Sequence, residues 1–160
     1  MKVLFCADGS EGALAALRWG ARLVRGAGAE ARVLYVVPEV DERFRHYERL
    51  HEDELQDIER LFGDQGPGVD VLVRAREVLR REGVDADRKV RTGDPAEEIL
   101  AEIREGHYDM VVLASRGMSA VERFLLGSVS QRVCQEAKAS VLLVKLPEGE
   151  GEGDGGTRAQ

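Results

Sequence analysis

Several residue types are scarce in this chain of 160 residues: asparagine is absent, cysteine occurs twice, and aromatic residues make up 5% of the sequence. The two cysteines, Cys6 and Cys134, lie far apart and outside any CxxC or metal-ligand spacing, so we predict two buried free thiols and no metal site. The missing asparagine fits either selection against thermolabile residues or a biased genome, and composition does not separate the two.

The chain also lacks an excess of positive charge and a hydrophobic leader. Its formal net charge is −7, and residues 148–160 hold four acids and one Arg, which leaves −4 before them. Neither value suits a surface that binds nucleic acid. The N-terminus, MKVLFCADGSEG, has one Lys and a short apolar run broken at Asp8, typical of neither a signal peptide nor a membrane helix. We therefore expect a cytoplasmic protein with no nucleic-acid or membrane partner.

Short apolar runs alternate with longer amphipathic stretches along the chain. The runs that predict buried strands are residues 2–7, 31–37, 87–91, 110–114 and 140–145. The stretches with apolar residues at helical spacing are 11–25, 41–62, 69–81, 93–106 and 129–137. Ser10 and Asp94 are the predicted N-caps of two of these helices, and Pro95 follows Asp94 at a first helical position.

This alternation predicts an α/β fold with a five-stranded, mostly parallel sheet and helices on both faces. Residues 1–146 form one domain in this interpretation. Residues 147–160, PEGEGEGDGGTRAQ, contain almost nothing to bury, and we expect an acidic, Gly/Glu-rich disordered tail.

Ligands of such folds bind at the carboxyl ends of the strands, so the segments that follow the strands are the candidate sites. A Walker A loop, GxxxxGK[ST], occurs nowhere in the chain. Residues 26–31 satisfy GxGxx[GA], but they follow a predicted helix and precede a strand, the reverse of a dinucleotide fingerprint. We interpret them as a helix end with a turn.

One glycine-containing segment has the right context for an anion site. Residues 113–133, LASRGMSAVERFLLGSVSQRV, start at a strand end and finish in a helix. Gly127, Ser128, Val129 and Ser130 would direct backbone amides and hydroxyls out of the helix N-terminus, which favours phosphate. With 18 glycines in the chain, chance spacing and ordinary N-capping also explain the same residues, and spacing alone favours that interpretation over a phosphate site.

These residues resemble the universal stress protein family, whose ATP-binding members carry Gly, two residues, Gly, nine residues, then Gly and Ser or Thr. Here Ala114 takes the first position, Gly117 the second, and Gly127-Ser128 close the motif. The similarity extends to residues 7–11 (ADGSE), 93–96 (GDPA) and the final strand, and covers nearly residues 1–146. It implies a Rossmann-like domain similar to the adenine nucleotide alpha hydrolases.

By this resemblance, adenine would lie near Asp8 and Val36, with ribose and phosphates along the loop. The full set of candidate binding residues, including those chosen from strand ends alone, is Asp8, Gly9, Ser10, Val36, Ala114, Arg116, Gly117, Gly127, Ser128, Val129 and Ser130. Ala114 replaces the family's first glycine. A negative φ there would cost little, whereas a positive φ would cost about 1 kcal/mol and narrow the approach to the ribose.

Each candidate also has a structural interpretation. Asp8 could make a turn or cap the next helix, Arg116 could be solvated, and the serines could be N-caps. Residues 93–95 are assigned to a helix start, and residues 41–62 to a helix that could serve as a lid. The three histidines are scattered, which favours solvated side chains over a metal site.

Two functions remain from the sequence. The first is a regulatory protein of the stress response that binds ATP, with Mg²⁺ carried by the phosphates, and signals to an unknown protein partner. The alternative is a dimeric interaction module without a nucleotide. We expect any ATP hydrolysis to be slow and incidental, because no general base or carboxylate pair stands out beyond Asp8. The apolar final strand, from Ser140 to Lys145, should lie at a sheet edge and predicts a homodimer.

Overall fold

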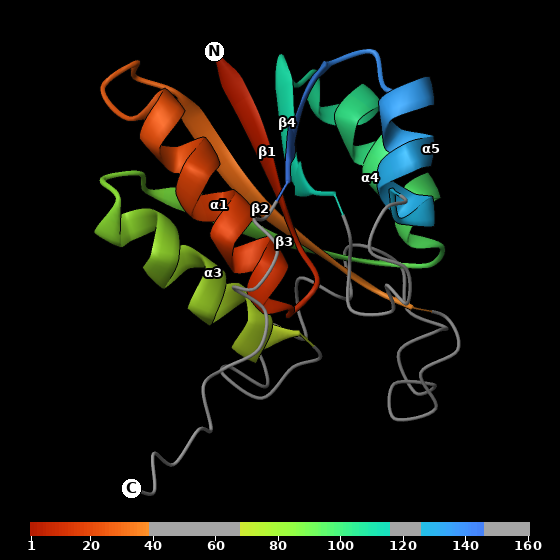
Figure 1. Ribbon diagram of the computed structural model, residues 1–160, viewed down its shortest axis with the longest axis horizontal. Coiled ribbons are helices and arrows are strands. Elements are labelled where there is room, and N and C mark those ends of the chain that lie inside the picture. Colours follow the sequence, from red (N-terminus) through yellow and green to blue (C-terminus); the bar gives the residue numbers. More distant parts are fainter. Residues whose placement is uncertain (39–67, 116–125, 146–160) are drawn as a thin grey trace, which may run out of the picture.

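The computed structural model describes residues 1–38, 68–115 and 126–145 of the chain (Figure 1). The strands are β1 (Lys2–Ala7), β2 (Glu30–Val37), β3 (Ala86–Thr92), β4 (Met110–Ala114) and β5 (Ser140–Val144). The helices are α1 (Glu11–Val24), α3 (Val69–Arg81), α4 (Pro95–Gly106) and α5 (Ser128–Glu136). The predicted helix at 41–62 and the predicted tail at 147–160 lie outside the described residues.

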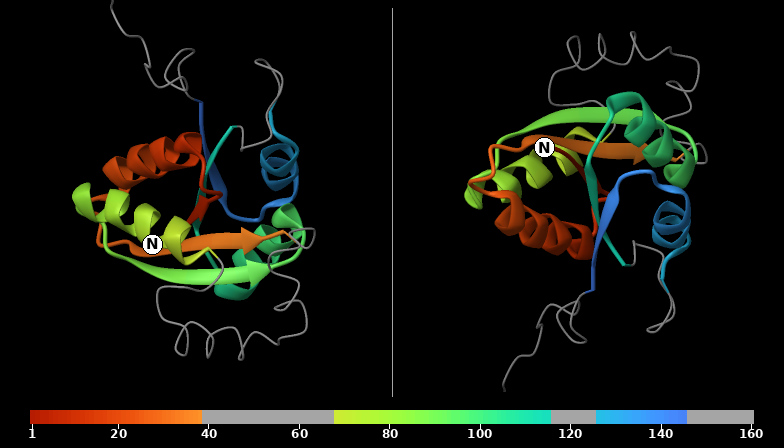
Figure 2. Two further views of the ribbon diagram at one scale, coloured as in Figure 1. Left: turned by 90° about the horizontal axis from the view of Figure 1, so that it is seen from below. Right: turned by 90° about the horizontal axis from the view of Figure 1, so that it is seen from above.

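The strands form one parallel sheet in the order β3-β2-β1-β4-β5. Helices α1 and α3 cover one face of the sheet, and α4 and α5 cover the other (Figure 2). The connections run from β1 outward to β3, and then through β4 to β5. The strand order therefore reverses between β1 and β4, which is where ligands bind in open sheets of this kind. The predicted α/β, Rossmann-like fold is confirmed.

Apolar side chains on alternate strand positions build a core on each face of the sheet. Phe5 and Val33 pack with Leu72 of α3 on one face, while Leu4 and Leu34 pack with Ile103 of α4 on the other. The central strands are apolar on both faces because both faces are covered.

Glycine at position 20 brings α1 close to the two strands that flank the reversal. A Cβ built on Gly20 would lie 2.7 Å from a methyl of Val112 and 2.9 Å from the ring of Phe5. Since real side chains do not approach so closely, only glycine lets α1 pack at this distance.

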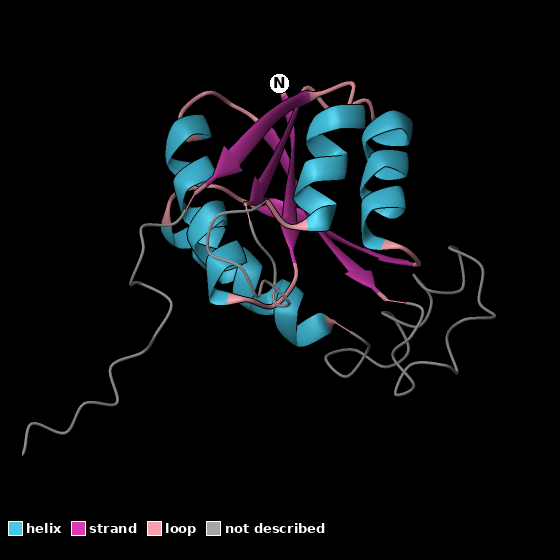
Figure 3. Ribbon diagram, turned by 45° about the vertical axis from the view of Figure 1, so that its right-hand side comes forward, coloured by secondary structure: helices cyan, strands magenta, loops and turns pink. Residues whose placement is uncertain are grey.

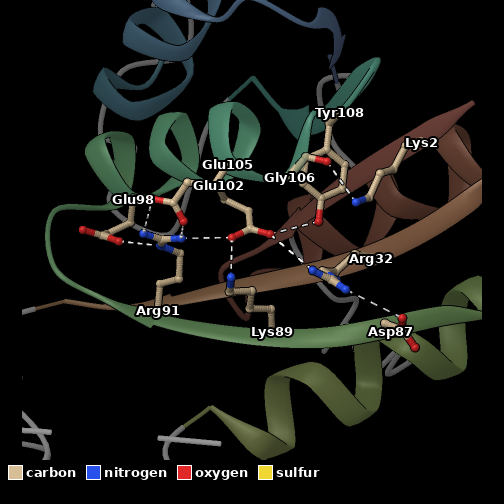
Figure 4. A network of polar contacts seen from close by, with 10 residues as sticks. All are labelled: Lys2, Arg32, Asp87, Lys89, Arg91, Glu98, Glu102, Glu105, Gly106 and Tyr108. Atoms are coloured by element: carbon tan, nitrogen blue, oxygen red, sulfur yellow. Dashed lines mark hydrogen bonds and ion pairs between the residues drawn. The ribbon is translucent and has the colours of Figure 1, made fainter. Parts of the chain in front are cut away.

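A buried ion cluster joins α4 to the sheet and was not predicted from the sequence (Figure 4). Glu102 of α4 is 1% exposed, and its carboxylate oxygens lie 2.8 Å from Lys89 Nζ, 3.0 Å from Arg91 Nη1 and 3.6 Å from Arg32 Nη1. Tyr108 donates its hydroxyl proton to the same carboxylate over 2.9 Å. The charge of Glu102 is thus compensated inside the helix–sheet interface.

Two further carboxylates complete the buried ion cluster around Arg91. The Arg91 guanidinium donates to Glu98 over 2.6 Å and to Glu105 over 2.9 Å. Burial alone would raise the pKa of Glu102, but hydrogen bonds from Lys89, Tyr108 and Arg91 outweigh it and hold that pKa below its ordinary value. Both Glu102 and Arg91 are therefore charged at neutral pH.

Candidate functional site

The carboxyl ends of the strands meet at one edge of the sheet, which is where Figure 3 shows the strand arrows pointing. The loop after β1 and the start of α5 both lie at this edge, beside the reversal between β1 and β4. We call this part of the molecule the β1–β4 edge, and define it by residues 8–10, 114–115 and 127–130. It includes most of the binding residues expected from the sequence.

The first part of the β1–β4 edge is a tight turn after β1. Asp8 Oδ1 accepts hydrogen bonds from the backbone N–H of Ser10 over 2.9 Å and from its hydroxyl over 2.6 Å. Gly9 has a φ of 87°, a conformation that favours glycine. Ser10 Oγ in turn accepts from the N–H of Ala13 over 3.0 Å and caps α1. Asp8 and Ser10 therefore have the predicted structural role, whatever ligand they also contact.

Ala114, the residue in place of the family's first glycine, sits in an unstrained conformation. It is the last residue of β4, and in the described part of the chain only one non-glycine residue, His107, has a positive φ. The methyl group of Ala114 packs with Ala16 of α1 and Val144 of β5, and the residue is 9% exposed. Ala114 therefore has a negative φ, the conformation in which alanine in place of glycine costs little free energy.

Backbone hydrogen bonds position the start of α5 beside the end of β4. The N–H of Ser115 donates to the carbonyl of Val144 over 2.9 Å, and the N–H of Gly127 donates to the carbonyl of Ser115 over 2.8 Å. Ser115 is thus attached to β5, and Gly127 is attached to Ser115. Arg116 and Gly117, which belong to that loop, lie outside the described residues.

The first turn of α5 has backbone amides without a side-chain cap. Gly127 is the N-cap, with φ −59° and ψ 151°, and as a glycine it has no side chain to hydrogen-bond to the helix start. The first helical hydrogen bond of α5 runs from the N–H of Gln131 to the carbonyl of Gly127. The N–H groups of Ser128, Val129 and Ser130 precede it and have no partner within the helix. Together with the helix dipole they form a positive end suited to an anion.

The two serines of this turn differ in what they offer a ligand. Ser128 is exposed, so its hydroxyl is accessible beside the amides. Ser130 is 4% exposed, and its hydroxyl donates to the carbonyl of Ala114 over 2.7 Å. That bond ties α5 to the end of β4, and a ligand that uses Ser130 would meet its backbone N–H.

Val36 lies at the other side of the β1–β4 edge, near the end of β2. Its side chain is buried with Ile99 on the face covered by α4. The carbonyl of the next residue, Val37, accepts from Gly93 N–H on the β3 side. Since backbone groups of successive residues point to opposite neighbours, Val36 directs its N–H and C=O toward β1. Its N–H belongs to the last pair of that ladder, Ala7 and Tyr35, where it meets the carbonyl of Ala7, and its C=O lies beyond the pair. This carbonyl is the acceptor that Val36 offers to the amino group of a purine.

The cysteines differ from each other, and one prediction is wrong. Cys6 is buried, and burial first and the nearby Asp8 charge second raise the pKa of its thiol to about 12. Cys134 is exposed, not buried as expected. Val133, the residue before it, is buried in the core between α5 and the sheet. Successive side chains of a helix point about 100° apart, so Cys134 is turned out of this core. Both thiols are free, as predicted.

Titratable side chains in the described part of the chain do not form a metal site. No group of three His, Cys, Asp or Glu side chains there could hold an ion. Of the three histidines, His46 and His51 lie outside the described residues, and His107 is exposed at the end of α4. No helix in the described ranges is long and apolar enough to span a membrane.

Comparison with known proteins identifies the family. The sequence model of the universal stress protein family matches residues 1–145. The chain belongs to the universal stress protein family. It is similar to the universal stress protein YxiE of Bacillus subtilis, with 30% identity over 147 residues that cover 90% of this chain and 98% of the relative. It is also 29% identical to the universal stress protein MJ0531 of Methanocaldococcus jannaschii, across 93% and 84% of the two chains.

Solved structures of the universal stress proteins share this fold. The hypothetical protein MJ0577 superposes with a TM-score of 0.69 at 25% identity, covering 91% of this chain and 96% of that one. A universal stress protein in complex with cAMP superposes with a TM-score of 0.66 at 23% identity, covering 90% and 96%. Similar folds are solved with AMP, for an Arabidopsis thaliana member, and with dAMP, for an Archaeoglobus fulgidus member.

Proposed function

We propose that this universal stress protein binds ATP at the β1–β4 edge and acts as a nucleotide-responsive regulatory protein in the stress response. The observation that carries the proposal is the start of α5, where uncapped amides point out of a helix beside the strand-order reversal. Relatives of the same fold with cAMP, AMP and dAMP support an adenine nucleotide as the ligand.

The conformation of Gly127 supports a role in ligand approach. Its φ of −59° and ψ of 151° are open to any residue, so the backbone does not require glycine here. Ser, Asp or Asn would also cap the helix better than glycine. An unused capping position at the positive end of α5 leaves room for a phosphate, which would accept from the amides of Ser128 and Val129 in place of a side chain.

The remaining predicted residues complete the proposed site. Adenine would lie at the backbone groups of Val36, with Asp8 near the ribose or base. Arg116 and Gly117 would contact the phosphates, and the phosphates would carry the bound Mg²⁺. Because Ala114 has an unstrained backbone, its methyl group gives no reason to expect loss of binding. Hydrolysis would be slow, because a single carboxylate, Asp8, lies at the described edge without a second beside it.

The proposal extends to assembly and location. Strand β5 ends the sheet, and its edge would pair with a second copy to form a homodimer. The free thiols of Cys6 and Cys134 suit a reducing compartment and support a cytoplasmic location. A regulatory protein would recognise the nucleotide-bound arrangement, and residues 147–160 would remain a disordered acidic tail beyond the domain.

Calorimetric titration with Mg·ATP, ADP and AMP tests the proposal. We expect micromolar ATP binding by the wild type, and at least about tenfold weaker binding, equivalent to about 1.4 kcal/mol, in the variant Gly127→Val. Ser128→Ala should weaken binding less, since the backbone amide remains. Val73→Ala, which changes an exposed valine of α3 outside both the β1–β4 edge and β5, is the control and should bind like the wild type.

A well-folded wild type that shows no binding at millimolar ATP would contradict the proposal. The dimeric module without a nucleotide would then be the better assignment, and Ala114→Gly would test whether the methyl group is responsible. If the wild type hydrolyses ATP at ordinary enzyme rates and Asp8→Ala abolishes this activity, the protein is an ATPase and not a binding protein.

A further inference from the structure

One flank of α1 carries large apolar side chains in solvent. Trp19 is 55% exposed and Leu23 is 62% exposed, and they are four residues apart, one above the other on the helix. The other members of this flank are Gly12, Ala15 and Ala16, so it holds no charged side chain from Gly12 to Leu23. We call these five residues the α1 apolar flank. Trp19 and Leu23 are not among the buried residues of the helix, so the apolar surface of α1 extends beyond the part that packs in the core.

The α1 apolar flank faces the β5 edge of the sheet. Ala16, on the inner side of the flank, packs with Leu142 and Val144 of β5. The charged residues of α1 occupy the opposite flank and pair with α3: Arg22 with Glu82 at 3.0 Å, Arg18 with Glu82 at 4.0 Å, and Glu11 with Arg74 at 2.8 Å. Helix α3 therefore lies along the charged side of α1, and β5 lies on its other side (Figure 2).

Strand β5 adds an open row of backbone groups beside this flank. Ser140 donates its N–H to the carbonyl of Asp109, and Val144 accepts from Ser115, so both residues direct their backbone groups toward β4. By alternation, Val141 and Leu143 direct their N–H and C=O groups outward. In the described part of the chain, β5 has a strand on one side only. The open edge of β5, from Ser140 to Val144, and the α1 apolar flank thus lie side by side, and these described residues carry no charged side chain.

We propose that a second copy of this chain covers Trp19 and Leu23 when β5 pairs antiparallel with its counterpart. This inference rests on the homodimer of the proposed function, and adds a contact between the α1 helices to the pairing of the β5 strands. A two-fold axis perpendicular to the sheet places both α1 helices on the same face, so each apolar flank meets the other. The described residues of β5 and of the α1 apolar flank are uncharged in both copies, so the two flanks do not repel each other.

A stable interface also buries more area than the paired β5 strands can supply. Such interfaces bury about 800 Å² per partner. A strand of five residues is about 17 Å long, and its edge presents much less than that area. Trp19 and Leu23 supply the missing area with an aromatic anchor of the kind that dominates binding energy at interfaces.

Sedimentation over a concentration series tests this surface with three matched variants. Leu23→Glu places a charge on the α1 apolar flank, and Val73→Glu makes the same change at an exposed valine of α3, which is 45% exposed. Leu143→Pro removes an outward N–H of β5 without removing a bond to β4. Trp19 is the only tryptophan of the chain, so acrylamide quenching of its fluorescence reports directly on burial of the flank.

The expected result is a wild-type dimer whose dissociation constant rises at least tenfold in Leu23→Glu and does not change in Val73→Glu. Quenching of Trp19 should also increase as the wild type is diluted into monomers. A dimer that is lost in Leu143→Pro, yet unaffected by Leu23→Glu, would overturn the α1 surface and leave the strand pairing intact. A wild type that is monomeric at all concentrations would overturn both the homodimer and this inference.

Discussion

Replacement of Glu102 by glutamine should destabilise the protein more than any exposed charge substitution. Glu102→Gln preserves the shape of a side chain that is 1% exposed and can still accept from Tyr108, but it removes the negative charge that Lys89, Arg91 and Arg32 share. Breaking a buried ion pair costs about 3–5 kcal/mol, because the partner is left buried and uncompensated.

The structure places the expected cost at the lower end of that range. Arg91 keeps Glu98 and Glu105 as partners, and Lys89, whose side chain is 23% exposed, can turn toward solvent. We therefore expect a loss of about 3 kcal/mol, which for a chain of this size lowers the melting temperature by roughly 6–12 °C. Glu77→Gln is the control, because its pair with Arg81 is exposed on both sides and should contribute little.

The pH dependence of this loss separates charge from packing. The fold holds the pKa of Glu102 below its ordinary value, so its ionised form stabilises the native state in full above the unfolded pKa of about 4.3. That contribution disappears as the pH falls through the folded pKa. Glutamine does not titrate, so the gap between wild type and variant should be full at pH 7 and shrink below about pH 4.

Urea unfolding at a series of pH values measures the gap directly. A variant as stable as the wild type at pH 7 would refute the assignment of Glu102 as a compensated buried charge. A gap that stays constant down to pH 3 would show that the loss comes from packing and not from ionisation.

Three other substitutions or treatments have defined outcomes. Ser130→Ala should lower the free energy of unfolding by about 1–3 kcal/mol, because it leaves the carbonyl of Ala114 without its buried donor; urea titration would show no change if a water replaced the hydroxyl. Gly20→Ala should cost about 1–3 kcal/mol, since the new methyl meets Val112 at 2.7 Å, and an unchanged melting temperature would mean that α1 moves freely. In the native protein a thiol reagent should modify Cys134 alone, with Cys6 reacting only after unfolding, and fast native modification of Cys6 would contradict its burial.

The strands and helices follow from patterns that are local in the sequence. The run of residues 2–7 and the amphipathic stretch at 69–81 were predicted with the bounds that the structure has, because burial on both faces or on one stripe leaves a direct periodic pattern. Ser10 and Asp94 cap the helices as predicted, through bonds to residues three positions later. The N-cap signal is short-range chemistry, so a single sequence carries it.

The buried ion cluster could not be predicted in the same way. Glu102 belongs to an acidic stretch, EEILAEIRE, that is typical of a solvated helix face, and its partners come from β2 and β3. Only the tertiary arrangement brings Arg32, Lys89 and Arg91 to the same carboxylate. The exposure of Cys134 was also missed, because a nine-residue helix with two buried positions has a weak apolar stripe.

The candidate site was predictable in outline and not in detail. The position of residues 8–10 and 127–130 at strand ends follows from the alternation of elements alone. The hydrogen bond from Ser130 to Ala114 spans 16 positions and has no sequence signal, although it decides which polar groups of α5 remain for a ligand. The unstrained φ of Ala114 also required the structure.

Nuclear magnetic resonance of the labelled protein during titration with Mg·ATP tests the central claim most directly. An adenine nucleotide at the β1–β4 edge should shift the amide signals of Gly9, Val36, Ser128 and Val129 most strongly. The amides of α3 and of the opposite ends of the strands should change little. Shifts concentrated away from the β1–β4 edge, or no shifts at millimolar ATP, would contradict the proposed nucleotide site.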